Sequence, residues 1–281
     1  MIVKKSLKKN TNDIAIDAPI VSVLMPLYCP DLEQFKASLN SLDNQTLKAF
    51  ELVIIDDTPD NQEIKSLLRA YKKLNINYHH NKKQIGLAKS LNYGLGLCTS
   101  DYIARADCDD KYHQTRLEVQ LNFLKKNLDI DLCGSNCIRI NNEGKIIGVR
   151  SFPEVDKMIK SKIHIINPIA HPTVMAKKSF FNDLNGYSEN TNVEDYELWF
   201  RAKQINKKFY NIQSNLCYLR VLNASESRRS RHWFENLILK LKYFDAKNIL
   251  YSIAGVMVFI IISILPPSIS NFLDRARNRI S

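Results

Sequence analysis

The alternation of buried strands with amphipathic segments is the feature that most constrains the fold of this chain. A short apolar run bounded by turn residues predicts a buried strand, and apolar residues at helical spacing predict a helix. The expected strands are 19–28, 50–56, 76–80, 102–106, 131–140 and 145–150, and the expected helices are 32–44, 60–73, 86–97 and 113–127. This βαβ series predicts an α/β fold, a mostly parallel sheet flanked by helices on both faces.

The second half of the chain is less regular. A loop and a strand are expected over 167–178, a helix over 190–203 and an extended segment over 208–221. An amphipathic helix follows, because apolar residues recur at helical spacing from Trp233 to Phe244 while charged and polar residues occupy the other side.

The length and composition limit the class of protein. A chain of 281 residues suffices for one large α/β domain, or for a domain of about 220 residues with an appendage. The six cysteines include no CxxC pair, so a zinc site is not expected and the thiols are predicted to be reduced, as in the cytosol. The sequence also lacks a P-loop, and the GxG at 94–98 ends a helix, so a dehydrogenase or P-loop enzyme is not expected.

The net charge of +11 is concentrated at the two ends of the chain. Residues 11–227 carry 27 basic and 26 acidic side chains, whereas residues 228–281 carry nine and three. A nucleic-acid partner is not expected, because it calls for a basic stripe on the folded domain. Basic ends beside an apolar segment suit an anionic membrane surface, at about 1 kcal/mol per Lys or Arg; the alternative is that they are merely solvated.

An uncharged segment of 17 residues, 249–265, follows the amphipathic helix and ends at Pro266 and Pro267. A membrane-spanning helix needs about 20 apolar residues, so this segment is at the lower limit. An apolar hairpin or helix embedded in the cytoplasmic leaflet is favoured over a true span and over a buried core helix. Residues 1–17 are polar and rich in lysine, and they are expected to form a flexible basic leader without a signal peptide.

Acidic residues follow two of the predicted parallel strands. Asp56 and Asp57 end the second strand, and Asp107, Asp109 and Asp110 follow the strand at 102–106. Ligands of such sheets bind beyond the carboxyl ends of the strands. Mg²⁺ prefers carboxylates together with substrate phosphates. The pattern therefore predicts a metal-bridged diphosphate at this edge, against the alternative that the acids are turn and cap residues.

A nucleoside diphosphate bound with a metal can donate a phosphoryl, nucleotidyl or glycosyl group. Inverting glycosyl transfer also requires a base for the acceptor hydroxyl. Asp195 fits this role, because the dipole of the helix it begins favours an ionised carboxylate. Glu194, Tyr196 and Trp199 could shape an acceptor pocket around it. The alternative is an acidic first turn followed by aromatic core residues.

Seven segments in one order resemble glycosyltransferase family 2, the inverting enzymes of GT-A fold. The segments are VSVLMPLYCPD, ELVIIDDTPDN, NKKQIGLAKSLNYGL, DYIARADCDD, NPIAHPTVM, GYSENTNVEDYELWFRA and YLRVLNASES. They look most like those of bacterial enzymes that build capsule, O-antigen or other exopolysaccharide. The resemblance covers about residues 19–228. It implies a GT-A domain at 18–228, with a nucleotide-binding half (18–110) and an acceptor and catalytic half (111–228). The leader at 1–17 precedes this domain, and a membrane-associating helical tail at 229–281 follows it.

The resemblance also implies a role for individual residues. The nucleotide and donor site would comprise Pro26, Tyr28, Asp56, Asp57, Gly86, Asp107, His171 and Arg220. Asp109 would be the metal ligand proper, with Asp107 on the metal or the ribose, and Asp195 takes the position of the catalytic base. The chain departs from the family at Cys29, where asparagine is usual, and at Leu222, where a histidine often stands.

These features together predict a membrane-associated, inverting glycosyltransferase at the cytoplasmic face of the cell membrane. It would use a UDP-sugar and Mg²⁺ or Mn²⁺ to extend a lipid-linked or cell-surface glycan. A metal-dependent nucleotidyltransferase and a non-catalytic scaffold of the same fold are the alternatives.

Overall fold

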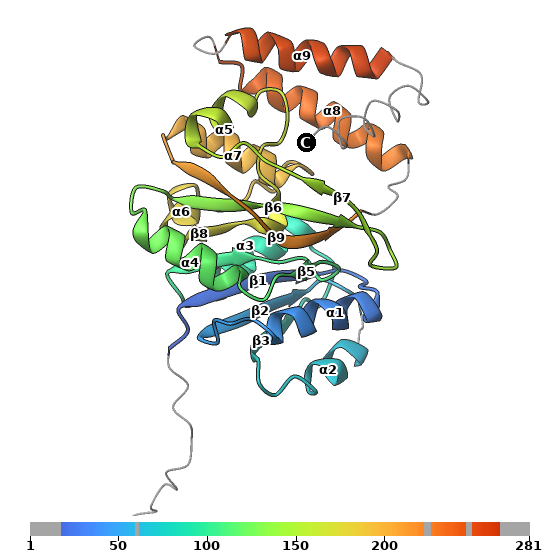
Figure 1. The fold of residues 1–281 in the computed structure, drawn as a ribbon. Coiled ribbons are helices and arrows are strands. Elements are labelled where there is room, and N and C mark those ends of the chain that lie inside the picture. Colours follow the sequence, from blue (N-terminus) through green and yellow to red (C-terminus); the bar gives the residue numbers. More distant parts are fainter. Residues whose placement is uncertain (1–17, 60–61, 222–225, 246–248, 265–281) are drawn as a thin grey trace, which may run out of the picture.

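The computed structural model describes residues 18–59, 62–221, 226–245 and 249–264 (Figure 1). The expected leader at 1–17, Leu222, Pro266, Pro267 and the late arginines lie outside this part. Within it, nine strands form one sheet in the order β3-β2-β1-β4-β8-β6-β9-β5, with β7 paired to β6. The strands are β1 Val21–Leu27, β2 Phe50–Asp56, β3 Asn75–His80, β4 Tyr102–Arg105, β5 Lys111–Tyr112, β6 Leu132–Ile140, β7 Ile146–Arg150, β8 Met175–Lys177 and β9 Phe209–Arg220.

The sheet is mixed, which corrects the expectation of a mostly parallel one. Strands β3, β2, β1 and β4 are parallel neighbours, and this half follows the predicted βαβ series. Beyond β4, strand β8 is antiparallel, β6 is antiparallel to β8, and only the β6–β9 pair is parallel again. Strand β8 follows the short helices Asp156–Lys162 and His171–Thr173 and enters the sheet antiparallel to both neighbours, so the βαβ series, which parallel pairing requires, ends at β4.

Two apolar layers cover the sheet. Helices α1 Leu32–Asp43, α2 Gln62–Leu68 and α4 Arg116–Lys126 pack on one face, where Val23 and Met25 of β1 point. Helices α3 Leu87–Leu97, α5 Asp156–Lys162, α6 Lys178–Asp183 and α7 Glu194–Gln204 pack on the other, where Leu24 points. Because both faces are covered, every residue of β1 and β2 is buried, as their continuous apolar runs predict.

The sequence pattern misses the shortest elements. Helices α5 and α6 have seven and six residues, and β5 has two. Such segments hold too few residues to show a period, and β5 forms through its pairing with β9, more than 100 residues further along the chain. Helix α2 is also shorter than expected, since it ends at Leu68.

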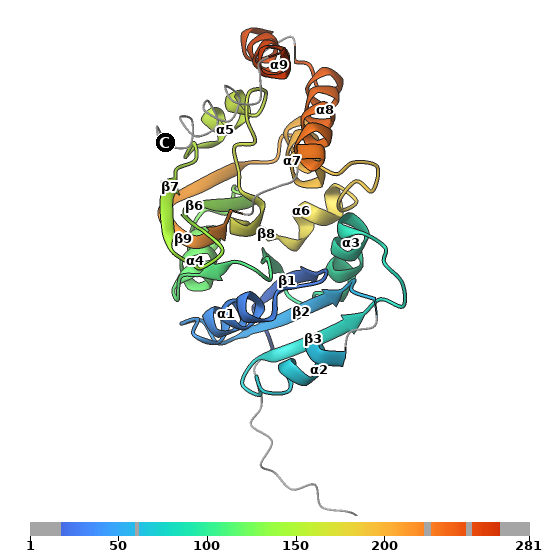
Figure 2. The same cartoon turned by 90° about the vertical axis from the view of Figure 1, so that its right-hand side faces the viewer.

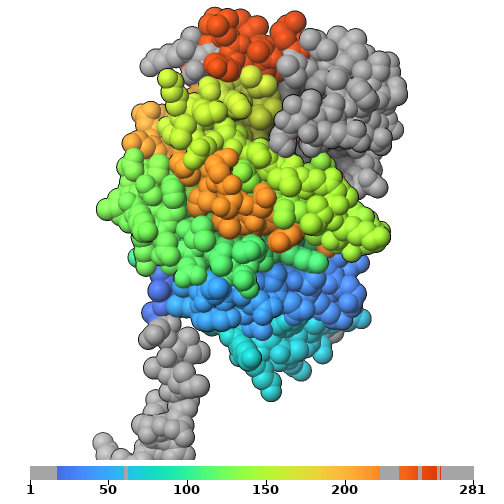
Figure 3. All heavy atoms as spheres, viewed as in Figure 1, coloured from blue at the N-terminus to red at the C-terminus, as the bar shows by residue number. Residues whose placement is uncertain are grey.

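The C-terminal helices lie at the end of the molecule opposite α2 (Figures 1 and 3). Helix α8 (Glu226–Lys242) runs continuously across the domain boundary expected at residue 228 and lies beside α7 (Figure 2). Leu239 of α8 and the following Tyr243 belong to the apolar core that α7 joins. Helix α9 (Ile249–Ile264) rests on the domain through Gly255, where a Cβ atom would lie 1.8 Å from the His164 carbonyl oxygen.

Both helices expose apolar side chains, so the described part of 249–265 is not enclosed in the core, which was the least favoured alternative. The exposed set is Phe234, Ile238 and Leu241 on α8, Phe244 after it, and Ile249, Leu250, Tyr251, Ile253, Met257 and Ile260 on α9. Among the described helices, none combines the length and the apolar character needed to cross a membrane.

Candidate active site

A cleft of about 750 Å³ lies between the carboxyl end of β4, the start of α3 and the start of α7. Six of the sequence-predicted site residues line it: Gly86, Asp107, His171, Glu194, Asp195 and Tyr196. Segments far apart in the sequence therefore meet in one cavity, with the expected donor-site acid Asp107 and the expected base Asp195 both on its wall.

The acids after β4 form a cluster that fits a hard divalent cation. Carboxylate oxygens of Asp107, Asp109 and Asp110 all lie within 4.8 Å of one another. Burial raises the pKa of the Asp109 carboxyl, with the neighbouring Asp107 adding to it, and the same two causes raise the pKa of the buried Asp110 well above its ordinary value. Negative charges held this close favour binding of a cation, and oxygen ligands of this kind suit Mg²⁺ or Mn²⁺.

Arg220 holds this acidic loop against β9. Its backbone N–H donates to the Asp110 carboxylate over 2.7 Å, and its Nε donates to the Asp109 carbonyl oxygen over 2.9 Å. The Nη1 group donates to the carbonyl oxygens of Asn141 and Asn142. The guanidinium thus fixes the loop that carries the acids, and Arg220 does not line the cleft.

Asp195 is partly buried and oriented by two hydrogen bonds. The Asn167 side-chain amide donates to Oδ2 over 2.8 Å, and the Tyr196 backbone N–H donates to Oδ1 over 2.7 Å. Burial raises the pKa of Asp195 although both hydrogen bonds oppose the rise. The adjacent Glu194 is 7% exposed, and burial together with the charge of Asp195 raises its pKa to about 7. A carboxylate that is oriented and less acidic than usual suits a general base.

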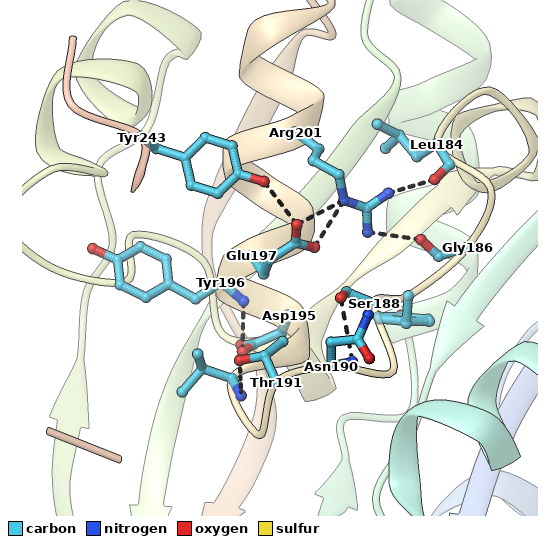
Figure 4. A network of polar contacts seen from close by, with 12 residues as sticks. Leu184, Gly186, Ser188, Asn190, Thr191, Asp195, Tyr196, Glu197, Arg201 and Tyr243 are labelled. Atoms are coloured by element: carbon cyan, nitrogen blue, oxygen red, sulfur yellow. Dashed lines mark hydrogen bonds and ion pairs between the residues drawn. The ribbon is translucent and has the colours of Figure 1, made fainter. Parts of the chain in front are cut away.

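Helix α7 is itself held by a polar network (Figure 4). The Arg201 guanidinium pairs with Glu197 over 2.8 Å and donates to the carbonyl oxygens of Leu184 and Gly186. The Tyr243 hydroxyl donates to the same Glu197 over 2.8 Å. Because two separate segments, one at Leu184 and Gly186 and one at Tyr243, bind to α7, the position of Asp195 at its start is fixed.

Two aromatic residues of the expected acceptor pocket have different positions. Tyr196 lines the cleft, and its hydroxyl donates to the Ile163 carbonyl oxygen. Trp199 is fully buried and packs against His171 and Phe180, so it supports the cleft wall from the core and does not line it. Trp199 is four residues, about one helical turn, beyond Asp195 on the same side of α7, and it lies in the domain interior.

His171 stands at the base of the cleft as a neutral side chain. Its Nε2 is 2.8 Å from the Tyr187 hydroxyl, and its ring is 8% exposed. Burial, with a smaller effect of Arg105, keeps the pKa of His171 well below its ordinary value. At neutral pH it therefore offers hydrogen bonding and shape to a ligand, and not positive charge.

The expected nucleotide residues lie at the ends of β1 and β2. Asp57 accepts hydrogen bonds of 2.8 Å from the backbone N–H groups of Ile85 and Gly86, and so fixes the loop that begins α3. Asp56 is fully buried and accepts from the Tyr78 hydroxyl over 2.7 Å. Pro26 is within β1 and the side chain of Tyr28 is 54% exposed. None of these four lines the cleft, although Asp57 shapes it through Gly86.

The neighbouring Cys29, where the chain departs from the family, has an unusual backbone conformation. Its φ is 45°, in the left-handed region where asparagine is enriched among residues other than glycine. The asparagine that the family usually has would therefore adopt this conformation at lower cost.

Helix α8 contributes to the site, which the sequence pattern did not indicate. Asn236 lines the cleft. Glu235 accepts a 2.7 Å hydrogen bond from the Asn192 backbone N–H and further bonds from the side chains of Asn192 and Thr191. Since Thr191 and Asn192 line the cleft just before Glu194, α8 holds the loop that leads into α7.

Comparison with known proteins agrees with this geometry. Among curated proteins, the O-antigen biosynthesis glycosyltransferase WbnJ of Escherichia coli is 32% identical over 232 residues, which are 82% of this chain and 90% of that protein. The UDP-Gal:alpha-D-GlcNAc-diphosphoundecaprenol beta-1,3-galactosyltransferase of Escherichia coli is 28% identical, covering 92% of this chain and 96% of that protein. The bifunctional glycosyltransferase pgtA of Dictyostelium discoideum is 33% identical over 75% of this chain, which spans only 34% of its length.

Solved structures show the same fold. Staphylococcus aureus TarS in complex with UDP-GlcNAc superposes with a TM-score of 0.62 at 18% identity, over 85% of this chain and 71% of that one. The mannosyltransferase PcManGT of Pyrobaculum calidifontis, in complex with GDP-Man and Mn²⁺, gives 0.66 at 14% identity, over 92% and 80%. The family model described as glycosyl transferase family 2 matches residues 22–184, and the chain therefore belongs to glycosyltransferase family 2.

Proposed function

We propose that this glycosyltransferase moves a sugar from a UDP-sugar to a hydroxyl of a lipid-linked or cell-surface glycan, with inversion at the anomeric carbon. The observation that carries the proposal is the position of Asp195, which is partly buried, doubly hydrogen-bonded and on the wall of the same cleft as Asp107. A base on one wall and a donor site on the other is the arrangement that in-line displacement needs.

The residues divide the reaction between them. Asp195 takes the proton of the acceptor hydroxyl. The oxygen of that hydroxyl bonds to the anomeric carbon, and the bond from this carbon to the diphosphate oxygen breaks. Asp109 and Asp107 would hold a divalent metal, which would supply positive charge to the leaving diphosphate. The crowding of three carboxylates within 4.8 Å fits such an ion. PcManGT, of similar fold, was solved with Mn²⁺, which supports Mn²⁺ or Mg²⁺ here.

The proposed donor and the proposed acceptor are supported by different comparisons. TarS was solved with UDP-GlcNAc and PcManGT with GDP-Man, so UDP is the first donor nucleotide to test and GDP the second. The name of the Escherichia coli galactosyltransferase specifies a diphosphoundecaprenol acceptor, which supports a lipid-linked glycan as the acceptor class. Membership of a glycosyltransferase family removes the support for a nucleotidyltransferase.

Asp195→Asn tests the base. Asparagine keeps the shape and can still bond Asn167 and Tyr196, but it cannot take a proton. We expect nucleotide binding to be unchanged in calorimetry and turnover to fall by about 10² to 10⁴, the contribution of a positioned base. Proton NMR of the product from the wild-type enzyme checks inversion, and unchanged turnover in Asp195→Asn would remove Asp195 from the mechanism.

Attachment to the cytoplasmic face of the membrane is part of the same proposal. Its support is the apolar side chains exposed on α8 and α9, together with the basic residues of the C-terminal region. Burying a large apolar side chain contributes roughly 1.5 to 3 kcal/mol, so several of them outweigh the charge contribution. Detergent should then release the protein from membranes whereas salt should not.

Leu250→Glu is the matched test of this attachment. Leu250 on α9 is 79% exposed, and Ile146 on β7 is 65% exposed away from these helices. We expect Leu250→Glu to reduce flotation with vesicles of an anionic phospholipid, and Ile146→Glu to leave it unchanged. Equal effects of the two substitutions, or a wild-type protein that does not float, would contradict membrane attachment through α9.

A further inference from the structure

Arg105 is a buried cation on the wall of the cleft. It ends β4, it is 3% exposed, and its Nη1 forms an ion pair with Asp107 two residues further on. The alternation of an extended chain places residues two apart on the same side, which explains how Arg105 and Asp107 face the same cavity. Neither the predicted donor site nor the predicted catalytic residues include it.

The hydrogen bonding of Arg105 is incomplete. Its Nη1 is engaged by the Asp107 carboxylate, whereas its Nε group is buried and has no hydrogen-bond acceptor in the described part of the chain. A buried N–H group without an acceptor is costly and rare in proteins. Since the Nε group belongs to a residue that lines the cleft, a ligand in the cleft is the natural source of its acceptor.

No described residue accepts a hydrogen bond from the Arg105 Nε group. Asp195 bonds to Asn167 and to the Tyr196 backbone, and the Asp57 carboxylate bonds to the loop before α3. The charge of Arg105 nevertheless lowers the pKa of Glu194 and of Asp195, so it lies within electrostatic range of both. The same charge also lowers the pKa of Asp109 and of Asp110, so the guanidinium acts on the acids after β4 as well as on those at the start of α7.

We propose that Arg105 is a donor-binding residue whose guanidinium hydrogen-bonds the diphosphate of the nucleotide-sugar. A planar guanidinium fork matches phosphate oxygens and remains charged at all relevant pH values. The inference rests on the proposed function, because it takes a nucleoside diphosphate as the ligand. In the reaction Arg105 stabilises the charge that develops on the departing phosphate oxygen, and it exchanges no proton.

The test compares Arg105→Gln and Arg105→Lys with Arg116→Lys as the matched control. Arg116 is also fully buried, and its Nη2 donates to the carbonyl oxygens of Arg105 and Val174 outside the cleft. Titration calorimetry measures binding of UDP, and in parallel of GDP and uridine, with Mn²⁺ present. Electron paramagnetic resonance measures binding of Mn²⁺ alone.

We expect Arg105→Gln to weaken UDP binding by about 10- to 100-fold, the contribution of a hydrogen bond to a charged group. Uridine binding should not change, and Mn²⁺ alone should bind as tightly or more tightly, because Asp107 loses a competing cation. Arg105→Lys keeps the charge without the fork and should show an intermediate loss. Arg116→Lys should lower the melting temperature and leave UDP affinity unchanged.

Two results would overturn the assignment. If Arg105→Gln and Arg105→Lys both bind UDP like the wild type, Arg105 does not contact the diphosphate. If UDP and Mn²⁺ affinity fall together, Arg105 only positions Asp107 for the metal. Should Arg105→Gln fail to fold, Arg105→Lys decides by the same comparison. A wild-type protein that binds neither UDP nor GDP contradicts the proposed function itself, and this outcome is separate from the behaviour of the variants.

Discussion

Glu194→Gln should stabilise the ligand-free protein at alkaline pH. Glu194 is buried beside Asp195, and these two causes raise its pKa from 4.5 to about 7. A carboxyl with a raised pKa binds its proton more tightly in the folded state than in the unfolded state. Its ionisation therefore lowers the free energy of unfolding as the pH rises from about 4.5 to about 7, and the loss is complete above that range.

The size of the effect follows from the same pKa values. One pKa unit corresponds to 1.36 kcal/mol, so the raised pKa of Glu194 lowers the free energy of unfolding by about 3 kcal/mol at pH 8 and by about 1 kcal/mol at pH 5. Glutamine has nearly the same shape and no charge to bury. Glu194→Gln should therefore be more stable than the wild type by about 3 kcal/mol at pH 8, with a much smaller difference at pH 5.

Denaturant unfolding at the two pH values, without nucleotide or metal, measures this difference. The matched control is Glu189→Gln, because Glu189 lines the same cleft but is exposed, and surface substitutions usually change stability by less than about 0.5 kcal/mol. A stability difference for Glu194→Gln that is the same at pH 5 and pH 8 would show that the charge of Glu194 is not buried as the structure has it.

Three further predictions concern the metal, the loop and α9. Asp109→Ala should abolish stabilisation by Mn²⁺ with UDP in thermal melts, and a full stabilisation in that variant would contradict the assignment of the metal site. Glu235→Ala should leave UDP affinity unchanged and lower kcat, because the Thr191–Asn192 loop loses its acceptor on α8; steady-state kinetics and calorimetry separate the two. Gly255→Ala should increase hydrogen exchange in α9, because the added Cβ would meet the His164 carbonyl oxygen at 1.8 Å; unchanged exchange would mean that α9 does not rest there.

Local sequence patterns were sufficient for the first half of the fold. The expected strand at 50–56 coincides with β2, and the helix expected at 86–97 begins one residue later in α3. These elements are long and buried on defined faces, so their apolar period is visible in the sequence. The same reasoning placed Asp107 and Asp195 where the structure brings them into one cleft, since strand ends and helix starts are local features.

The exact partners of each side chain depended on the tertiary structure. Trp199 and Tyr196 belong to one helical turn pattern, yet one is in the core and the other lines the cleft. Arg220 was expected at the donor and instead bonds to the loop that carries the acids. Sequence spacing gives the direction of a side chain only relative to its own helix or strand, and not relative to what packs against it.

The sequence by itself determined the βαβ half, the acidic cluster after β4 and the family, because each is encoded in a continuous stretch of residues. Only the tertiary structure decided that the sheet reverses at β8, that Arg105 is buried beside Asp107, and that Glu235 of α8 holds the loop before Glu194. The physical reason is that these features depend on contacts between residues distant in the sequence, such as Glu235 and Asn192, which are 43 positions apart. Packing of the two apolar layers brings such residues together, and no local period records it.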